Sequence, residues 1–237
     1  MTGANNLVAN VPASKAAEVF TQETVFSELR GLTQPKFTKD YPRGSVIFVE
    51  GEQPRGVYVL CEGRVKVSIS SASGKTLVLR VAQPGELLGI NATISGRPYG
   101  ATVKTLDKCR LDFIPREQFL RLIDKDNRVY AAVYNALCLK FSNVVDHTRL
   151  LFLSESASEK LARLLVRWCD DIGIRTPKGI RIESRLTHEE MAQMICSSRE
   201  TVTRLLSEFK QRRILTLVNN AILVRNRTAL EALTSSS

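Results

Sequence analysis

The chain has 237 residues and is 43% hydrophobic, which is enough for two domains with packed cores and excludes a wholly disordered protein. Its formal net charge is +10 at pH 7, and residues 157–237 carry 14 Lys and Arg against 9 Asp and Glu. Positive charge is therefore densest in the C-terminal third, as a phosphate-binding surface requires, although an ordinary basic surface has the same composition.

The few cysteines and histidines, and the lack of long apolar runs, disfavour disulfide-rich, zinc-binding and membrane proteins. No C-x-x-C pair occurs, the cysteine count is odd, and only two histidines are present, so neither a disulfide framework nor a structural zinc site is expected. No apolar run has the length of a signal peptide or a membrane span. We therefore expect a cytoplasmic protein with reduced thiols and no membrane partner. No nucleophile–base–acid set is recognisable, so the chain is not expected to be an enzyme.

Residues 38–114 have a hydrophobic pattern of period two, which is typical of strands. Val65, Val67 and Ile69 alternate with polar residues, and the alternation resumes over residues 77–81, so a hairpin is expected. This regular punctuation by turns indicates an antiparallel barrel or jelly roll. A short helix is expected before it, over residues 20–34, around Phe26, Leu29 and Leu32. The turn positions are Gly44, Gly51, Gly56, Gly63, Gly74 and Pro84-Gly85.

Residues 126–152 predict one long helix of roughly 40 Å. An apolar seam runs along it with alternating spacings of four and three, which is typical of contact between two helices. The seam pairs with a second helix or packs on the chain's own roll. Ser154–Ser158 interrupts the helix, and Ser156 with Glu159 can cap a new one, so a hinge is expected near residues 153–156. The seam residues are Tyr130, Tyr134, Leu137, Phe141, Val144, Thr148 and Leu151.

Residues 186–210 predict two short helices joined by a tight turn. Thr187 and Glu190 form a capping-box pattern at the start of the first helix. Cys196-Ser197-Ser198 breaks the pattern, and the second helix then has one buried stripe. The stripe consists of Val202, Leu205, Leu206 and Phe209, whereas Ser198, Arg199, Glu200, Thr203 and Arg204 lie off it, at the N-terminal end of the helix.

This N-terminal end carries the chemistry of base recognition. A helix-turn-helix places this end of its second helix in the major groove of DNA. Arg199 and Arg204 can each donate two hydrogen bonds to guanine, and Glu200 can accept one from N4 of cytosine. Two plainer interpretations are a surface ion pair between Glu200 and Arg204 and a capping box between Ser197 and Glu200.

A small hairpin wing is expected after the second helix. It comprises Ile214–Val218 and Ala221–Val224 around Asn219-Asn220. Arg225 and Arg227 follow the wing, where they can contact phosphate.

These motifs resemble the Crp/Fnr family of transcription regulators. SSRETVTRLLSEFKQRRIL is similar to the family's recognition helix, whose pattern is close to S-R-E-T-V-x-R-x-L, although Cys196 stands where the family usually has glycine. YPRGSVIFVEGEQPRGVYVLCEGRVKVSI is similar to the first half of its cyclic-nucleotide-binding-type roll. The resemblance covers residues 25–233. The six matching recognition-helix positions are Ser198, Arg199, Glu200, Thr201, Val202 and Arg204.

The resemblance implies an α+β protein in three parts. An N-terminal antiparallel β-roll or jelly roll (20–125) is the sensor, a long dimerisation helix (126–153) follows, and a winged helix-turn-helix (156–233) binds DNA. It implies a parallel homodimer on a palindromic operator, with a half-site resembling TGTGA and RNA polymerase as a partner. The alternative is a nucleotide-binding signalling module that acts through protein partners. The expected interface residues are Tyr134, Leu137, Phe141 and Val144.

We expect the protein either to bind operator DNA without a cyclic nucleotide or to respond to a small molecule other than cyclic AMP in the same cavity. PGELLG (84–89) occupies the place of the family's phosphate-cradling turn, but Tyr99-Gly100 replaces the Arg-Ser pair of cyclic-AMP-binding relatives. Tyrosine supplies neither a permanent charge nor paired donors, although Arg97 lies nearby. No iron–sulfur cluster is expected because no cysteine precedes Cys61, and no heme because residues 1–146 lack histidine. The expected pocket residues are Gly85, Glu86, Leu87, Arg97, Tyr99 and Gly100.

Overall fold

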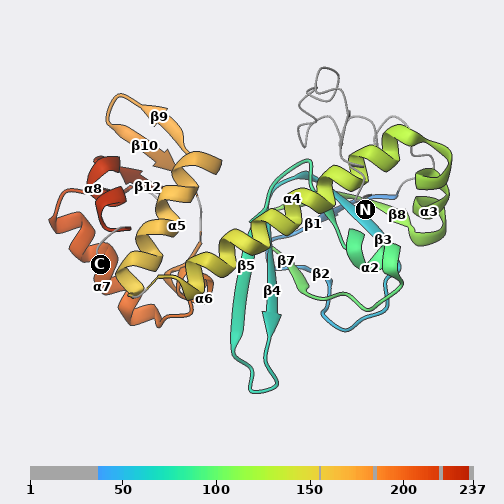
Figure 1. Cartoon of the computed structure of the whole chain (residues 1–237), viewed down its shortest axis with the longest axis horizontal. Helices are drawn as coiled ribbons and strands as arrows, with labels where there is room; N and C mark the ends of the chain where they lie inside the picture. Colours follow the sequence, from blue (N-terminus) through green and yellow to red (C-terminus); the bar gives the residue numbers. More distant parts are fainter. Residues whose placement is uncertain (1–36, 155, 184–185, 219–220, 235–237) are drawn as a thin grey trace, which may run out of the picture.

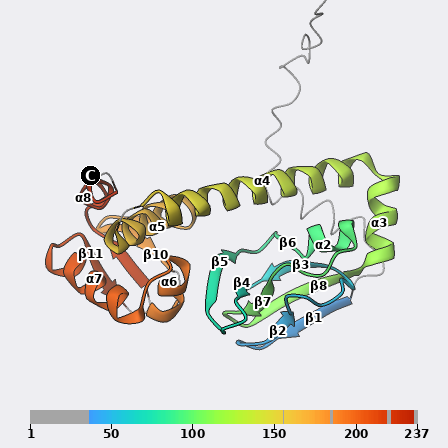
Figure 2. The same cartoon turned by 60° about the horizontal axis from the view of Figure 1, so that its bottom comes forward.

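The computed structural model describes residues 37–154, 156–183, 186–218 and 221–234. A roll of strands and a smaller C-terminal domain are joined by one long helix that runs across the roll (Figure 1 and Figure 2). This is the α+β architecture expected from the sequence. The helix expected over residues 20–34 and the wing turn at Asn219-Asn220 lie outside the described residues.

The roll consists of two antiparallel four-stranded sheets, ordered β1-β8-β3-β6 and β2-β7-β4-β5. Buried residues such as Leu60, Val65 and Val103 fill the space between them. The hairpin expected around Gly74 is confirmed as β4 and β5. The strands are β1 Phe37–Tyr41, β2 Val46–Phe48, β3 Gly56–Glu62, β4 Val65–Ser70, β5 Thr76–Ala82, β6 Leu87–Leu88, β7 Thr102–Thr105 and β8 Cys109–Pro115.

The strict alternation predicted for this hairpin is wrong at two points. The register of β4 shifts between Val67 and Ser68, so Ser68 is buried and Ile69 only half-buried. Such a bulge moves the residues after it to the other face of the sheet. In β5 the fully buried residue is Val78 rather than Leu77 or Leu79, because Val78 packs into the core of the C-terminal domain. Both faces of β5 are therefore covered.

Three helices follow the strands of the roll or lie among them: α2 (Ile90–Ser95), α3 (Arg116–Lys125) and α4 (Asn127–Phe152). Asp126 caps α4 by accepting a hydrogen bond from the Arg128 backbone nitrogen. The predicted range of this helix is thus confirmed to within one residue.

The long helix α4 carries two apolar stripes that are one residue out of step. One stripe is buried and contains Val129, Ala132, Val133, His147 and Leu150. The other is the predicted seam, and it is exposed at Tyr130 (58%), Tyr134 (58%), Phe141 (71%) and Val144 (59%). Because adjacent residues on a helix differ by about 100°, the two stripes face different directions. The possibility that the whole seam packs on the chain's own roll is therefore wrong, although Leu137 and Leu151 are partly buried.

The C-terminal domain begins at α5 (Ala157–Asp171), which Ser156 caps as expected. Its strands form one sheet in the order β11-β12-β10-β9, so the predicted hairpin β11–β12 is extended by a second hairpin that the sequence analysis missed. The remaining elements are β9 Ile174–Thr176, β10 Gly179–Ile182, α6 His188–Met194, α7 Arg199–Gln211, β11 Leu215–Val218, β12 Ala221–Val224 and α8 Arg227–Ala232.

The roll and the C-terminal domain touch directly as well as through α4. Lys66 of β4 forms an ion pair of 2.7 Å with Glu190 of α6. Arg64 donates a hydrogen bond to the Glu183 carbonyl oxygen. Glu190 also completes the capping box with Thr187, which confirms that predicted cap. One carboxylate therefore starts the helix-turn-helix and holds it to the roll.

Candidate DNA-binding surface and effector cavity

The second helix of the helix-turn-helix, α7, presents a polar N-terminal end to solvent. The Ser198 hydroxyl oxygen accepts a hydrogen bond from the Thr201 backbone nitrogen at 3.1 Å and caps the helix. Val202, Leu205, Leu206 and Phe209 are buried as predicted, which fixes the rotation of the helix. The residues on its outer side are all exposed, namely Ser198, Arg199, Glu200, Thr203 and Arg204.

Two of these exposed groups already have local partners. The pKa of Glu200 lies below its ordinary value because its own backbone N–H and the Ser198 hydroxyl hydrogen-bond its carboxylate. The capping residue is thus Ser198 rather than Ser197. Thr203 lies 2.8 Å from Nδ1 of His188, and its hydroxyl donates to the Arg199 carbonyl oxygen. His188 therefore ties α6 to the recognition surface, a role that the sequence analysis missed.

The turn between α6 and α7 holds Cys196 in a left-handed backbone conformation, with φ of 52°. Glycine adopts this conformation without a steric penalty, and other residues rarely do. This backbone conformation explains why the resembled family usually has glycine at this position. The Cys196 side chain is exposed.

The basic residues after the wing do not both face outward as expected. Arg227 is paired with Asp170 at 2.7 Å and with Glu231 at 2.6 Å, which fastens α8 to α5. Contact of Arg227 with phosphate stays a prediction, and these two ion pairs compete with it. Arg225 donates to the Thr216 hydroxyl at 2.8 Å.

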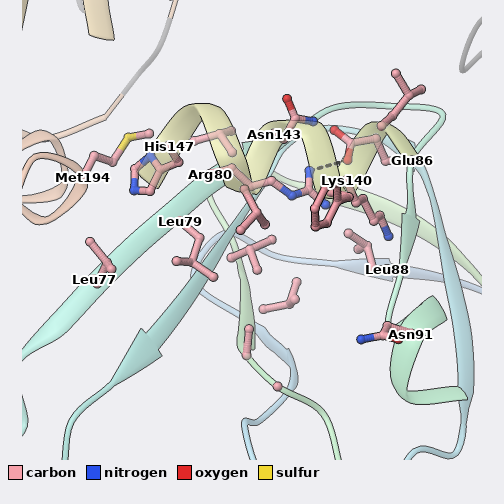
Figure 3. Close-up of a pocket in the computed structure, with 18 of the residues that line it drawn as sticks. Leu77, Leu79, Arg80, Glu86, Leu88, Asn91, Lys140, Asn143, His147 and Met194 are labelled. Carbon is pink, nitrogen blue, oxygen red and sulfur yellow. Dashed lines mark hydrogen bonds and ion pairs between the residues drawn. The ribbon is translucent and has the colours of Figure 1, made fainter. Parts of the chain in front are cut away.

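A cavity of about 1380 Å³ lies where the roll, α4 and the C-terminal domain meet (Figure 3). Glu86, one of the predicted pocket residues, lines it and is ion-paired with Arg80 of β5. Glu86 also accepts a hydrogen bond from the Gln83 backbone nitrogen at 2.8 Å. From the opposite wall, Lys140 of α4 donates to the Leu87 carbonyl oxygen. The predicted turn does contribute to a cavity, and its polar groups are already paired.

The backbone amides of the predicted phosphate-cradling turn are engaged elsewhere. The Gly85 nitrogen donates to the Leu60 carbonyl at 2.8 Å, and the Glu86 nitrogen donates to the Gln83 carbonyl at 3.3 Å. Since a buried phosphate needs several free donors, this turn is poorly prepared for one.

The other three predicted pocket residues, Arg97, Tyr99 and Gly100, also line this cavity. Tyr99 is only 3% exposed, its ring stacks on Phe48 at 4.0 Å, and its hydroxyl donates to the Gly56 carbonyl at 2.9 Å. Burial raises its pKa. Tyr99 is thus a core residue at the edge of the cavity, whereas Arg97 and Gly100 are exposed. The sequence analysis recognised the missing arginine but missed Arg80 and Lys140, which supply positive charge from other elements.

Two family models match this chain. The cyclic nucleotide-binding domain matches residues 38–126, and the Crp-like helix-turn-helix domain matches residues 159–233. The two spans coincide with the roll and the C-terminal domain, in this order. The chain belongs to the Crp/Fnr family. As a member of that family it is a DNA-binding transcription regulator.

Its Crp/Fnr relatives match over most of their length. The "Global nitrogen regulator" of Synechococcus elongatus is 28% identical over 215 residues, covering 87% of this chain and 94% of the relative. The "CRP-like cAMP-activated global transcriptional regulator" of Mycobacterium tuberculosis is 23% identical over 198 residues, covering 84% and 88%. The structure of FixK2 from Bradyrhizobium japonicum has a TM-score of 0.75 at 19% identity, covering 85% of this chain and 98% of that one, and therefore shares the fold.

The described part of this Crp/Fnr chain has neither a metal-binding cluster nor a membrane-spanning helix. Within it, no group of three or more His, Cys, Asp and Glu side chains is placed to hold a metal ion. No described helix is both long and apolar enough to cross a membrane. Cys109 of β8 is buried, and burial raises its pKa. A raised pKa keeps the thiol protonated and unreactive, which disfavours a redox switch at this position.

Proposed function

We propose that this regulator is a parallel homodimer that binds a palindromic operator through α7 of each copy. The observation that carries the proposal is the exposed group Arg199, Glu200 and Arg204 at the N-terminal end of a helix whose opposite side is buried. In this arrangement the two arginines read guanine and Glu200 accepts from cytosine. The half-site resembles TGTGA. The regulator works in the cytoplasm, where RNA polymerase is its protein partner.

The exposed seam of α4 supports the dimer. Soluble monomers rarely leave a continuous apolar stripe exposed to water. Here the exposed stripe continues for several turns of α4, beside a second stripe that is already buried within the chain. Tyr134, Leu137, Phe141 and Val144 lie at the spacing of a two-helix interface. A two-fold dimer brings two copies of α7 to one face of DNA, and half-sites one helical turn apart then match the two helices.

We further propose that an effector other than cyclic AMP controls the dimer. The paired amides at Gly85 and Glu86 support this assignment, because they are not free to bind a phosphate. Tyr99 supports it as well, because it replaces the arginine of cyclic-AMP-binding relatives and its hydroxyl is bonded to the Gly56 carbonyl. A ligand shifts a protein between two states only if it binds one of them better. The cavity meets this condition, because both the roll and the C-terminal domain line it.

A gel-shift titration tests the DNA-binding part of the proposal. The full chain is titrated against a two-fold symmetric duplex with two TGTGA half-sites, and against a duplex of the same composition with scrambled half-sites. We expect the symmetric duplex to bind at least about 10³ times more tightly, as specific sites do. Equal affinity for both duplexes would leave only nonspecific phosphate binding and would favour the protein-partner alternative.

A further inference from the structure

The cavity is larger than an ordinary ligand pocket and has two chemically different ends. Its volume of about 1380 Å³ exceeds the range of roughly 300–1,000 Å³ that is usual for small-molecule sites. Figure 3 shows Glu86 and Lys140 toward one end and His147 with Met194 toward the other. Apolar side chains connect the two ends, among them Leu77 and Leu79 of β5. The shape therefore favours an elongated ligand.

The end near Glu86 carries more positive than negative charge. Arg80 and Lys140 both face the single carboxylate of Glu86, and Arg80 is the partner that forms the ion pair. Among the described residues, no carboxylate forms an ion pair with Lys140, which donates only to the Leu87 carbonyl. Burial and the nearby Arg80 lower the pKa of Lys140 to about 7, and Glu86 only partly opposes them. One further anion would complete this cluster.

The other end is lined mainly by apolar side chains around one buried imidazole, and the charged side chains there, Arg167 and Asp171, form an ion pair of 3.3 Å with each other. His147 is only 8% exposed, and its Nε2 atom has no hydrogen-bond partner among the described residues. Burial, and then the charge of Arg167, lower its pKa, so the ring stays neutral near pH 7. Trp168, Leu186 and Met194 of the C-terminal domain line the same region. A neutral polar group among apolar walls suits a ligand's apolar body better than a second charge.

We propose that this cavity binds an elongated organic acid, with its carboxylate between Arg80 and Lys140 and its apolar body along Leu77 and Leu79 toward Met194. A nucleotide fits less well, because the turn amides are occupied and the Arg167 guanidinium at the far end is already bonded to Asn143 and Asp171. A neutral apolar molecule would leave the positive charge uncompensated. The inference deepens the proposed control by an effector, and it makes the effector a bridge between the roll and the C-terminal domain.

Binding of such an acid takes up a proton. Lys140 is partly neutral near pH 7, and a carboxylate beside it restores the ammonium form, with the proton supplied by the buffer. The charged groups that face Lys140 are Arg80 from β5 and Glu86 from the turn before β6. Lys140 is the group at this end whose pKa is lowered to about 7.

Isothermal titration of the full chain with decanoate and with decanol, its neutral counterpart, tests the inference. We expect decanoate to bind at least about tenfold more tightly than decanol, because only the acid compensates the charge. Between about pH 7 and about pH 8 the decanoate affinity should fall about fivefold, following the protonated fraction of Lys140. Decanol binding should not depend on pH.

Variants make the test decisive. Lys140→Met should reduce decanoate affinity to that of decanol and remove its pH dependence, whereas Lys104→Met, at an exposed position on β7, should change neither. Leu79→Trp should weaken decanoate more than hexanoate, because only the longer chain reaches past β5. Undetectable decanoate binding, equal binding of acid and alcohol, or an unchanged Lys140→Met variant would overturn the inference. Operator binding is measured separately without any acid, so failure of one proposal leaves the other standing.

Discussion

Replacement of Phe141 by glutamate should separate the two copies of the chain. Phe141 is 71% exposed in the single chain and lies in the middle of the α4 seam, between Leu137 and Val144. In a parallel two-fold dimer the same residue from each copy meets near the axis, so one substitution changes the interface twice. It removes two aromatic side chains and places two like charges close together.

The size of the effect follows from this exposure. Full burial of a phenylalanine side chain contributes roughly 1.5–3 kcal/mol, so loss of both copies costs about 3–6 kcal/mol before the charges are considered. A loss of about 3 kcal/mol already raises the dissociation constant of the dimer more than about a hundredfold. The charges act in the same direction, because buried like charges repel and lose hydration.

Sedimentation equilibrium measures this change directly. Ser142→Glu is the matched control, because it adds the same charge at the adjacent, exposed position off the seam. We expect Phe141→Glu to sediment as a monomer at concentrations where wild type and Ser142→Glu are dimers. Its operator affinity should fall as well, since two half-sites are no longer held by one particle. An unchanged dimer in Phe141→Glu would refute the assignment of the seam as the interface.

Four further outcomes are expected. Arg204→Ala should cost roughly 1–3 kcal/mol in operator binding and relax the preference for one base pair. Lys210→Ala should weaken binding to all DNA sequences alike. If Arg204→Ala also weakened binding to all sequences equally, Arg204 would be a phosphate contact. Titration calorimetry should detect no binding of cyclic AMP or cyclic GMP at micromolar concentration, and tight binding that disappears in Arg97→Ala would contradict our assignment of the cavity. Lys140→Met should raise the melting temperature near pH 7, because wild type must neutralise or bury that ammonium on folding. From about pH 7 to about pH 10 the unfolded wild-type chain holds more protons than the folded one, so wild-type stability rises with pH. The advantage of Lys140→Met in melting temperature should therefore shrink over this range. A constant difference in melting temperature would contradict the lowered pKa of Lys140. Cys196→Gly should stabilise the chain by up to about 1 kcal/mol in denaturant unfolding, since glycine adopts the left-handed turn without strain, and a loss of stability would show that the thiol has a structural role.

Features set by local sequence were predictable in this protein. The ends of α4 and the Thr187–Glu190 cap depend on residues a few positions apart, and both match the prediction closely. The outward side of α7 was also predictable, because its buried stripe leaves only one orientation for Arg199 and Arg204. Helical periodicity and capping therefore gave the candidate DNA surface.

Features set by contact between distant segments were not predictable. The Lys66–Glu190 pair joins residues 124 positions apart, and no local pattern indicates it. Packing against the C-terminal domain also buries Val78, which interrupts the alternation expected for β5. Lys140 did carry a signal, because it interrupts the inward-facing apolar stripe of α4 together with Asn143. The neighbouring cation Arg80, however, lies on a strand sixty positions earlier.

The central claim is that two copies of α7 read a symmetric operator, and selection from random DNA tests it most directly. The wild-type chain is used to enrich duplexes from a library with a long random segment, and the bound sequences are read after several rounds. We predict a two-fold symmetric motif whose half-sites are centred about 10–11 base pairs apart, the spacing of one helical turn. Enrichment of a single asymmetric motif, or of no motif at all, would contradict it.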